Sequence, residues 1–282
     1  MPSGRRPSPP ARSWAGPPAT SAFPPPSSRR SGWSRWSARI FPRSTSVFWS
    51  LEISTSPARY TGVRLENRET LDTQLNVFAD FHPTLPEAYR DSRLVFLANI
   101  QPELQLEVLE QVRDADFIAC DTMKLWLDTA RPGLERLMRR VHCVLMNDEE
   151  AVQFSGQRFL PAAARAILSY GPRAVIIKRG ENGSLLFTKE RVFLAPAHPL
   201  ETVRDPTGAG DAFAGGLLGA LARAGNDRDD VLRRGMLYGS VLGSLAVEDF
   251  SVRRIADTDI HEIEGRLSNL VDMISLDGTR AL

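Results

Sequence analysis

Cysteines and long apolar runs are scarce in this chain. It has 2 cysteines among 282 residues, and both sit in apolar stretches without the spacing of metal ligands, Cys120 in DFIACD and Cys143 in VHCVLM. Two such cysteines exclude a disulfide scaffold and are typical of buried, reduced thiols in a cytosolic protein. No apolar run approaches the roughly 18 to 20 residues needed to cross a bilayer. The sequence therefore predicts a cytoplasmic protein without a membrane partner.

Patterns typical of metal or nucleic-acid binding are also lacking in most of the chain. The four histidines are scattered without metal-like spacing, and we assign none of them a role. The net charge of +1 divides into +8 for residues 1–50 and −7 for the remainder. Because binding to a phosphate backbone needs clustered Lys and Arg, the mildly acidic remainder argues against a nucleic-acid partner.

Residues 1–50 contain no lysine and no acidic residue. They hold eight Arg, ten of the 20 Pro and twelve Ser, with neither a strand nor a helix period. Proline removes backbone donors, so we expect a disordered segment outside the folded domain. Three interpretations stay open: a basic arm, an organellar targeting peptide, and GC-rich DNA translated in a wrong frame. The lack of an apolar central region excludes a secretory signal.

From about residue 90, apolar runs of strand length alternate with stretches of helical period. The runs lie at 94–98, 117–120, 141–146 and 174–177, and the helical stretches at 103–112, 131–140 and 161–169. This order predicts an α/β fold whose parallel sheet is covered on both faces. Short runs at 184–188 and 192–195 predict antiparallel strands at the sheet edge, and helices are expected at 212–224, 229–247 and 259–274.

The stretch from 201 to 225 carries the clearest chemical signal. Gly208, Ala209 and Gly210 are small enough for backbone N–H groups to approach a ligand closely, and they lead into a predicted helix. Such a helix N-terminus is an anion hole that suits a transferring phosphoryl group. Asp211 stands at the start of this helix, where its carboxylate is either a catalytic group or an N-cap.

Residues 205–213, DPTGAGDAF, resemble the C-terminal signature of the ribokinase-like (PfkB) carbohydrate and nucleoside kinases, usually written D-T-x-G-A-G-D-x-F. Pro206 is a mild departure from that signature. The resemblance implies a three-layer αβα sandwich and an ATP-dependent kinase that phosphorylates a hydroxyl of a sugar or nucleoside. It also implies Asp211 as the general base and the Gly208–Gly210 backbone as the anion hole, which agrees with what phosphoryl transfer requires.

Two upstream segments are similar to further motifs of this family. Asn147 and Glu150 match its N-x-x-E motif, which implies Mg²⁺ binding, with Glu150 acting through water. The alternative is helix capping by Asn147 and a solvated acidic first turn. Lys178, Gly180 and Gly183 resemble the segment that lies under the nucleotide, and a solvated lysine with two turn glycines is the other interpretation.

Other candidate residues are less decisive. The resemblance implies a monovalent cation such as K⁺ near Asp205 and Thr207, and Thr207 is also a candidate for the nucleotide site. Asn99 and Asp121 each end a predicted strand, the edge at which ligands bind in open sheets, so both are candidates for contacting the acceptor. Turn formation explains these two residues equally well.

The resemblance assigns residues 51–282 to the kinase domain, with 51–90 as a remnant of its lid. Lids in this family often pair between subunits, so a homodimer is expected. The family's first strand, which ends in an aspartate, and its Gly-Gly-x-x-x-Asn segment are not found, and both bind the acceptor. We therefore expect the N-terminal strands to be missing or disordered, the sheet edge to be open and the acceptor site to be half built.

Two hypotheses of function follow from these observations. The first is a kinase that uses ATP and Mg²⁺. The second is a nucleotide-binding pseudokinase, or an inactive truncated or frameshifted member of the family. ATP binding without turnover would favour the second.

Overall fold

The computed structural model describes residues 59–60, 68–69 and 81–275. Within the segment predicted as a lid, β1 (Arg59–Tyr60) pairs antiparallel with β2 (Arg68–Glu69). The predictions for residues 1–50 and for lid residues 51–58, 61–67 and 70–80 fall outside the described residues, whereas the end of that segment, 81–90, contains the short helix α2 (Glu87–Arg90).

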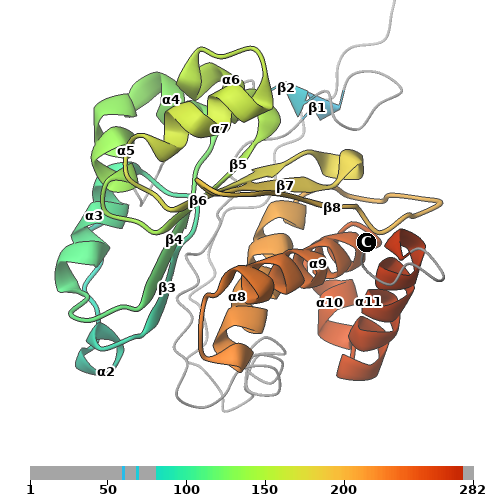
Figure 1. The fold of residues 1–282 in the computed structure, drawn as a ribbon. Coiled ribbons are helices and arrows are strands. Elements are labelled where there is room, and N and C mark those ends of the chain that lie inside the picture. Colours follow the sequence, from blue (N-terminus) through green and yellow to red (C-terminus); the bar gives the residue numbers. More distant parts are fainter. Residues whose placement is uncertain (1–58, 61–67, 70–80, 276–282) are drawn as a thin grey trace, which may run out of the picture.

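A six-stranded sheet in the order β3-β4-β5-β6-β7-β8 forms the centre of the domain (Figure 1). The first four strands are parallel, and the last three pair antiparallel, which confirms the predicted mixed arrangement. Within the described residues, β3 pairs only with β4 and so lies at one edge. The strands are β3 (Leu94–Leu97), β4 (Phe117–Asp121), β5 (Cys143–Asn147), β6 (Ala174–Lys178), β7 (Ser184–Phe187) and β8 (Val192–Ala195).

Helices connect the parallel strands and follow β8. All six of the predicted helical stretches are present, α6 is the helix that follows Asn147, and α2, α4 and α10 are additional short helices. Every helix in the described part of the chain is too short or too polar to span a membrane. The helices are α2 (Glu87–Arg90), α3 (Pro102–Gln111), α4 (Lys124–Thr129), α5 (Arg131–Met138), α6 (Asp148–Ser155), α7 (Leu160–Leu168), α8 (Ala209–Ala224), α9 (Asp229–Ala246), α10 (Arg253–Asp257) and α11 (Ile260–Ile274).

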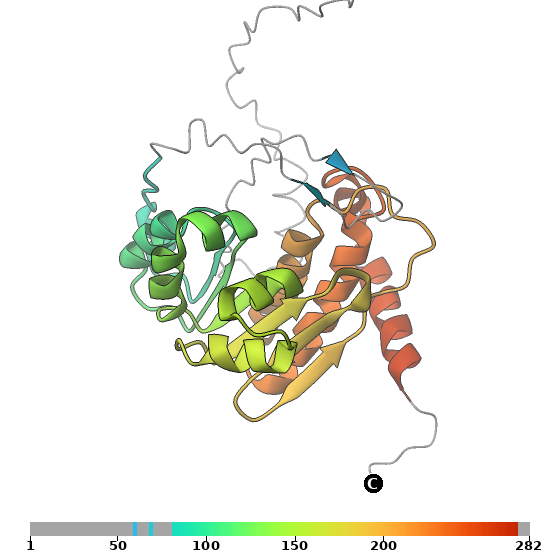
Figure 2. The same cartoon turned by 90° about the horizontal axis from the view of Figure 1, so that it is seen from above.

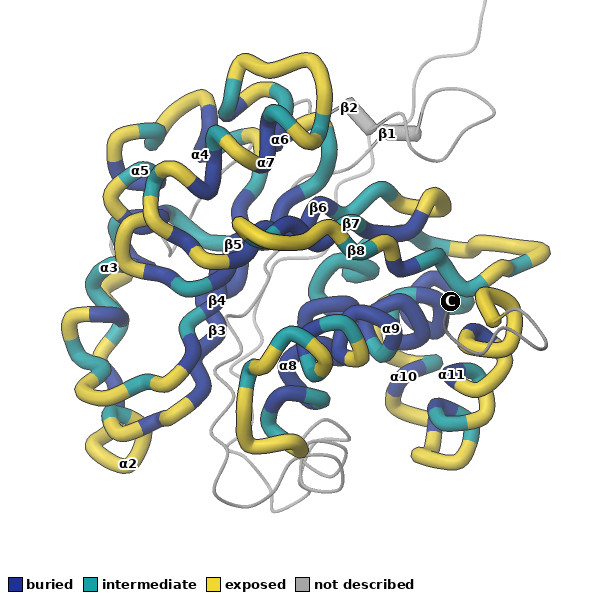
Figure 3. Tube along the Cα trace, in the orientation of Figure 1, coloured by how far each residue is buried: buried dark blue, intermediate teal, exposed yellow. Residues whose placement is uncertain are grey.

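The sheet lies between two helical layers, each with its own apolar core (Figures 1 and 2). Alternate residues of each strand enter opposite cores, because successive side chains of a strand point to opposite faces. In β5, Val144 joins the core under α3–α7, whereas Leu145 joins the core under α8–α11. Figure 3 shows the buried strands between helices whose outer sides are exposed. The predicted three-layer α/β architecture is confirmed.

Helices α8 and α9 pack against each other along a contact lined by glycine. A Cβ atom on Gly216 of α8 would lie 2.6 Å from the carbonyl oxygen of Tyr238, and one on Gly239 of α9 would lie 2.8 Å from that of Phe213. Both distances are shorter than a carbon–oxygen contact allows, so only glycine permits this close approach. The two helices are thereby held backbone against backbone.

The α8–α9 contact leads to a stability prediction. We expect Gly216→Ala to lower the free energy of unfolding by about 1–3 kcal/mol, because the new methyl group collides with the backbone of α9. The measurement is urea denaturation followed by circular dichroism.

Gly265→Ala is the matched control for this experiment. Gly265 lies on the exposed side of α11, and no atom comes within 4 Å of a Cβ placed there. Alanine should therefore raise helix stability by about 0.5–1 kcal/mol at this position. Equal effects of the two substitutions would contradict the close packing of α8 on α9.

Candidate active site

The carboxyl ends of the parallel strands and the N-terminus of α8 meet in one place. Asp121, Asn147 and Lys178 are the last residues of β4, β5 and β6, and Asn147 is paired with Lys178 across the ladder. A Cβ atom on Gly210, in the first turn of α8, would lie 3.0 Å from Nζ of Lys178. The fold therefore brings together candidates that are up to 90 residues apart in the sequence, from Asp121 to Gly210 and Asp211.

Helix α8 begins at Ala209, three residues earlier than predicted. Gly208 occupies the N-cap position with φ = 79°, a left-handed conformation that favours glycine. The interpretation of Asp211 as the N-cap is therefore wrong, and Asp211 is the third residue of the helix. The Ala209 N–H donates to the Pro206 carbonyl at 3.3 Å, whereas the ladder of α8 begins where Ala212 N–H donates to the Gly208 carbonyl at 2.9 Å. The N–H groups of the first turn of α8 therefore lie before the first regular hydrogen bond of the α-helix.

Lys178 is buried and paired rather than solvated. Its side chain is 19% exposed, and its ammonium donates a hydrogen bond of 2.5 Å to Oδ2 of Asp121, whose side chain is 5% exposed. The other carboxylate oxygen of Asp121 accepts from the backbone N–H of Thr122 at 2.9 Å. Both oxygens of Asp121 are thus engaged, and the solvated interpretation of Lys178 is wrong.

Three carboxyl groups determine the charge of this lysine. Burial alone would lower the pKa of Lys178, but attraction by Asp121, together with Glu150 and Asp211, outweighs burial and raises it. Burial raises the pKa of Asp121, and the neighbouring ammonium opposes that rise. The site therefore holds one protonated amine among several acidic groups.

Asn147 and Glu150 form a reciprocal capping box at the start of α6. The Glu150 N–H donates to Oδ1 of Asn147 at 2.7 Å, and the Asn147 N–H donates to Oε2 of Glu150 at 2.8 Å. The capping interpretation of Asn147 is confirmed, but its companion, a solvated first turn, fails at Glu150, which is 7% exposed. Burial raises the pKa of Glu150 to about 7, against the attraction of Lys178.

The donor atoms at this edge can be compared with the needs of Mg²⁺. In the described part of the chain, no group of three or more His, Cys, Asp or Glu side chains is arranged to hold a metal ion. Glu150 is the carboxyl group that the sequence assigned to the metal. Mg²⁺ usually keeps several waters and takes its other oxygens from phosphate. The residues therefore fit a hydrated ion shared with a phosphate ligand, and not a cage built by protein alone.

Gly180 and Gly183 belong to the tight turn after β6. Gly180 has φ = 53° and Gly183 has φ = 77°, and a short 3-10 turn (Gly180–Asn182) lies between β6 and β7. A Cβ atom on Gly183 would lie 2.2 Å from the carbonyl oxygen of Ala195. The turn interpretation of both glycines is therefore confirmed, and it leaves open a second role near a nucleotide.

Two other candidates stand apart from the pairing of Lys178 with Asp121. The amide of Asn99 accepts from the indole N–H of Trp126 at 2.9 Å and donates to Sδ of Met123 at 3.1 Å. Asp205 accepts from the backbone N–H of Thr207 at 3.0 Å, which closes the turn before α8.

Gln105 was not singled out from the sequence. It is 1% exposed, and its Nε2 donates to the carbonyl oxygens of Leu97, Ala98 and Asp121 at 2.9–3.1 Å. It thus ties the end of β3 to the end of β4 at Asp121, the partner of Lys178. Its position four residues before Leu109, on the buried side of α3, is the signal that could have identified it.

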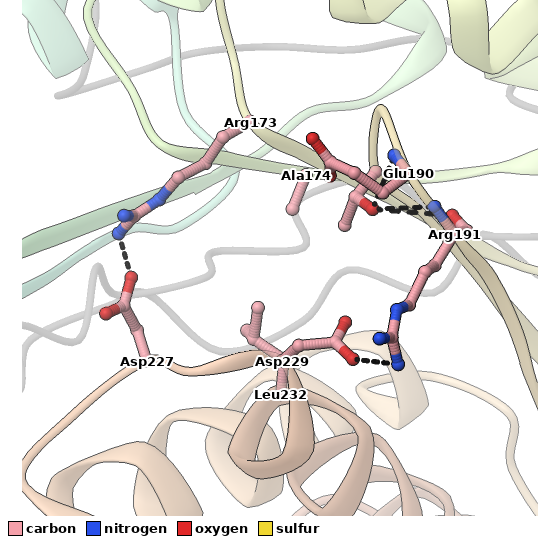
Figure 4. Close-up of a pocket in the computed structure, with 8 residues that line it drawn as sticks. Arg173, Ala174, Glu190, Arg191, Asp227, Asp229 and Leu232 are labelled. Carbon is pink, nitrogen blue, oxygen red and sulfur yellow. Dashed lines mark hydrogen bonds and ion pairs between the residues drawn. The ribbon is translucent and has the colours of Figure 1, made fainter.

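A separate cavity of about 330 Å³ lies at the opposite end of β6, where Ala174 begins the strand (Figure 4). Arg173 pairs there with Asp227, and Arg191 pairs with Asp229 at 3.5 Å. Both arginines are thus paired with aspartates, and the cavity lies at the amino end of the strand that carries Lys178 at its carboxyl end. It is therefore not part of the candidate site.

Comparison with known proteins identifies the family. Residues 66–258 match the model of the pfkB family carbohydrate kinases, which is more than half of the chain, so the protein belongs to this family. It is 35% identical over 159 residues to cytidine kinase from Thermococcus kodakarensis, covering 54% of this chain and 55% of that protein.

Solved structures agree with this assignment. Aminoimidazole riboside kinase from Salmonella enterica, complexed with aminoimidazole riboside and an ATP analog, has a TM-score of 0.55 at 26% identity and covers 62% of each chain. Methanocaldococcus jannaschii nucleoside kinase, at 22% identity, has a TM-score of 0.56, covers 69% of this chain and 60% of its own, and supports the fold. The chain spans about half the length of the cytidine kinase.

The raised pKa of Glu150 gives a prediction on pH and stability. The folded protein binds more protons than the unfolded chain between Glu150's ordinary pKa of 4.5 and its folded value of about 7. The free energy of unfolding therefore falls as pH rises through this window. Glu150→Gln keeps the capping box but removes this titration, so its stability relative to the parent should rise by about 3 kcal/mol between pH 4 and pH 8.

Thermal or urea unfolding in metal-free buffer at several pH values measures this difference. Glu110→Gln, at an exposed position of α3, serves as the control and should keep a constant difference from the parent. A constant difference between Glu150→Gln and the parent from pH 4 to pH 8 would show that Glu150 titrates normally.

Proposed function

We propose that the protein is an ATP-dependent phosphotransferase that phosphorylates a hydroxyl group of a sugar or nucleoside. The observation that carries the proposal is the position of Lys178, whose ammonium lies beside Gly210 in the first turn of α8. N–H donors, the positive end of a helix dipole and a protonated amine are all suited to an anion such as a triphosphate. Family membership and a relative complexed with an ATP analog support the choice of ATP.

Asp211 is the proposed general base. It follows the proposed anion hole, Gly208–Gly210, and it is close enough to influence the charge of Lys178. Its carboxylate would take the proton of the acceptor hydroxyl while the hydroxyl oxygen bonds to the γ-phosphorus. The bond from that phosphorus to the bridging oxygen breaks, and ADP leaves. The backbone N–H groups and Lys178 would stabilise the charge on the transferred group.

The remaining residues have supporting roles in this proposal. Glu150, with Asn147, would hold a hydrated Mg²⁺, which would supply positive charge to offset that of the phosphates. Gly180, Gly183 and Thr207 would lie along the nucleotide. Asp205 and Thr207 mark the turn where a monovalent cation would bind. Asn99 would line the acceptor side, and we propose a cytoplasmic, homodimeric enzyme.

The proposed base leads to a prediction on catalysis. We expect Asp211→Asn to lower kcat by about 10²- to 10⁴-fold, because the acceptor hydroxyl loses its proton acceptor. ATP affinity should change little in this variant. The measurements are ADP release over a panel of sugars and nucleosides, and calorimetric titration with ATP and Mg²⁺.

Asp230→Asn is the matched control for the charge of a helix N-terminus. Asp230 lies in the first turn of α9, as Asp211 does in α8, and its side chain is 58% exposed. This variant should retain full activity. ATP binding with no turnover by the parent protein, over the whole panel, would contradict the proposed transfer reaction.

A further inference from the structure

The placement of Lys178 is electrostatically unfavourable unless another group compensates. Its ammonium is buried, and it lies at the N-terminus of α8, where the helix dipole repels cations. A lysine side chain is also long and flexible, and ordering it costs conformational entropy. Some neighbouring group must therefore keep the ammonium both charged and in place.

Asp121 meets this requirement. Its Oδ2 accepts the 2.5 Å hydrogen bond from Lys178, and its Oδ1 is held by the Thr122 N–H. The Asp121 carbonyl oxygen accepts from Gln105 at 3.1 Å, so the end of β4 is also tied to α3. The carboxylate is thus held at both oxygens and the backbone of Asp121 at a third point, and the side chain is 5% exposed, which leaves little of it for contact with a substrate.

From this geometry we propose that Asp121 is a positioning residue, which holds the Lys178 ammonium against the first turn of α8 so that the lysine can meet the phosphates of the nucleotide. This assignment rests on the proposed phosphotransferase function. It replaces the sequence-based interpretation of Asp121 as a contact for the acceptor. Gln105 acts one step further away, because it holds the end of the strand that carries Asp121.

A double-mutant cycle tests the positioning role. The variants are Asp121→Asn, Lys178→Met and the double substitution, each measured for ATP affinity by calorimetry and for KM of ATP and of the acceptor. We expect Asp121→Asn to weaken ATP binding about 10- to 100-fold, the effect of losing a hydrogen bond between charged groups. The double variant should bind ATP no more weakly than Lys178→Met, because Asp121 acts only through the lysine.

Asp116→Asn is the matched control at the other end of the same strand. Asp116 pairs with Arg93 at 2.6 Å, but both side chains are about 60% exposed, so this variant should bind ATP like the parent. Thermal unfolding of all variants measures their folding. Asp121→Glu, which keeps the charge, should recover part of the lost ATP affinity.

Three results would overturn the positioning role. These are unchanged ATP affinity in Asp121→Asn, a rise in the acceptor KM alone, and single effects that multiply in the double variant. If the parent does not bind ATP, the proposed function fails, and crystal structures of the parent and Asp121→Asn still test the positioning. The Lys178 ammonium should leave Gly210 in the variant, and an unmoved lysine would contradict the proposal.

Discussion

The buried ion pair between Lys178 and Asp121 is the constraint on which the candidate site depends. Each partner would be costly to bury alone, so their burial requires that β4 and β6 end at the same level and that α8 begins beside them. Both strands flank β5, whose own end supplies the capping box of α6. The charge pairing and the strand register therefore support each other.

Much of the fold could be predicted because its signals are local. Apolar runs bounded by polar residues located the six strands, and the predicted end of α8 at residue 224 is correct because the left-handed Gly225 follows it. The start of α8 was placed too late because the left-handed Gly208, and not Asp211, is the N-cap, and this depends on backbone angles. The short helices α4 and α10 were missed because six and five residues give too little periodicity to read.

The candidate site likewise has a part that the sequence predicts and a part that it does not. The glycine-rich turn, Asp211 and the N-x-x-E segment stand out because each is a compact motif within one stretch of chain. The partnership of Lys178 with Asp121 joins residues 57 positions apart, and no local pattern specifies it. The contacts of Gln105 are equally non-local. Pairings across neighbouring strands appear only once the order of the sheet is known.

The glycine contact between α8 and α9 has a consequence for how the molecule can change. Since backbone lies against backbone there, α8 cannot slide or rotate without α9, so the two helices move as one body. In the proposed function this helix pair carries the turn at Gly208–Gly210 that faces the phosphates, so that side of the site would be stiff. Engineering of acceptor preference should therefore start outside the pair, at Asn99 after β3, which belongs neither to the helix pair nor to the Lys178–Asp121 ion pair.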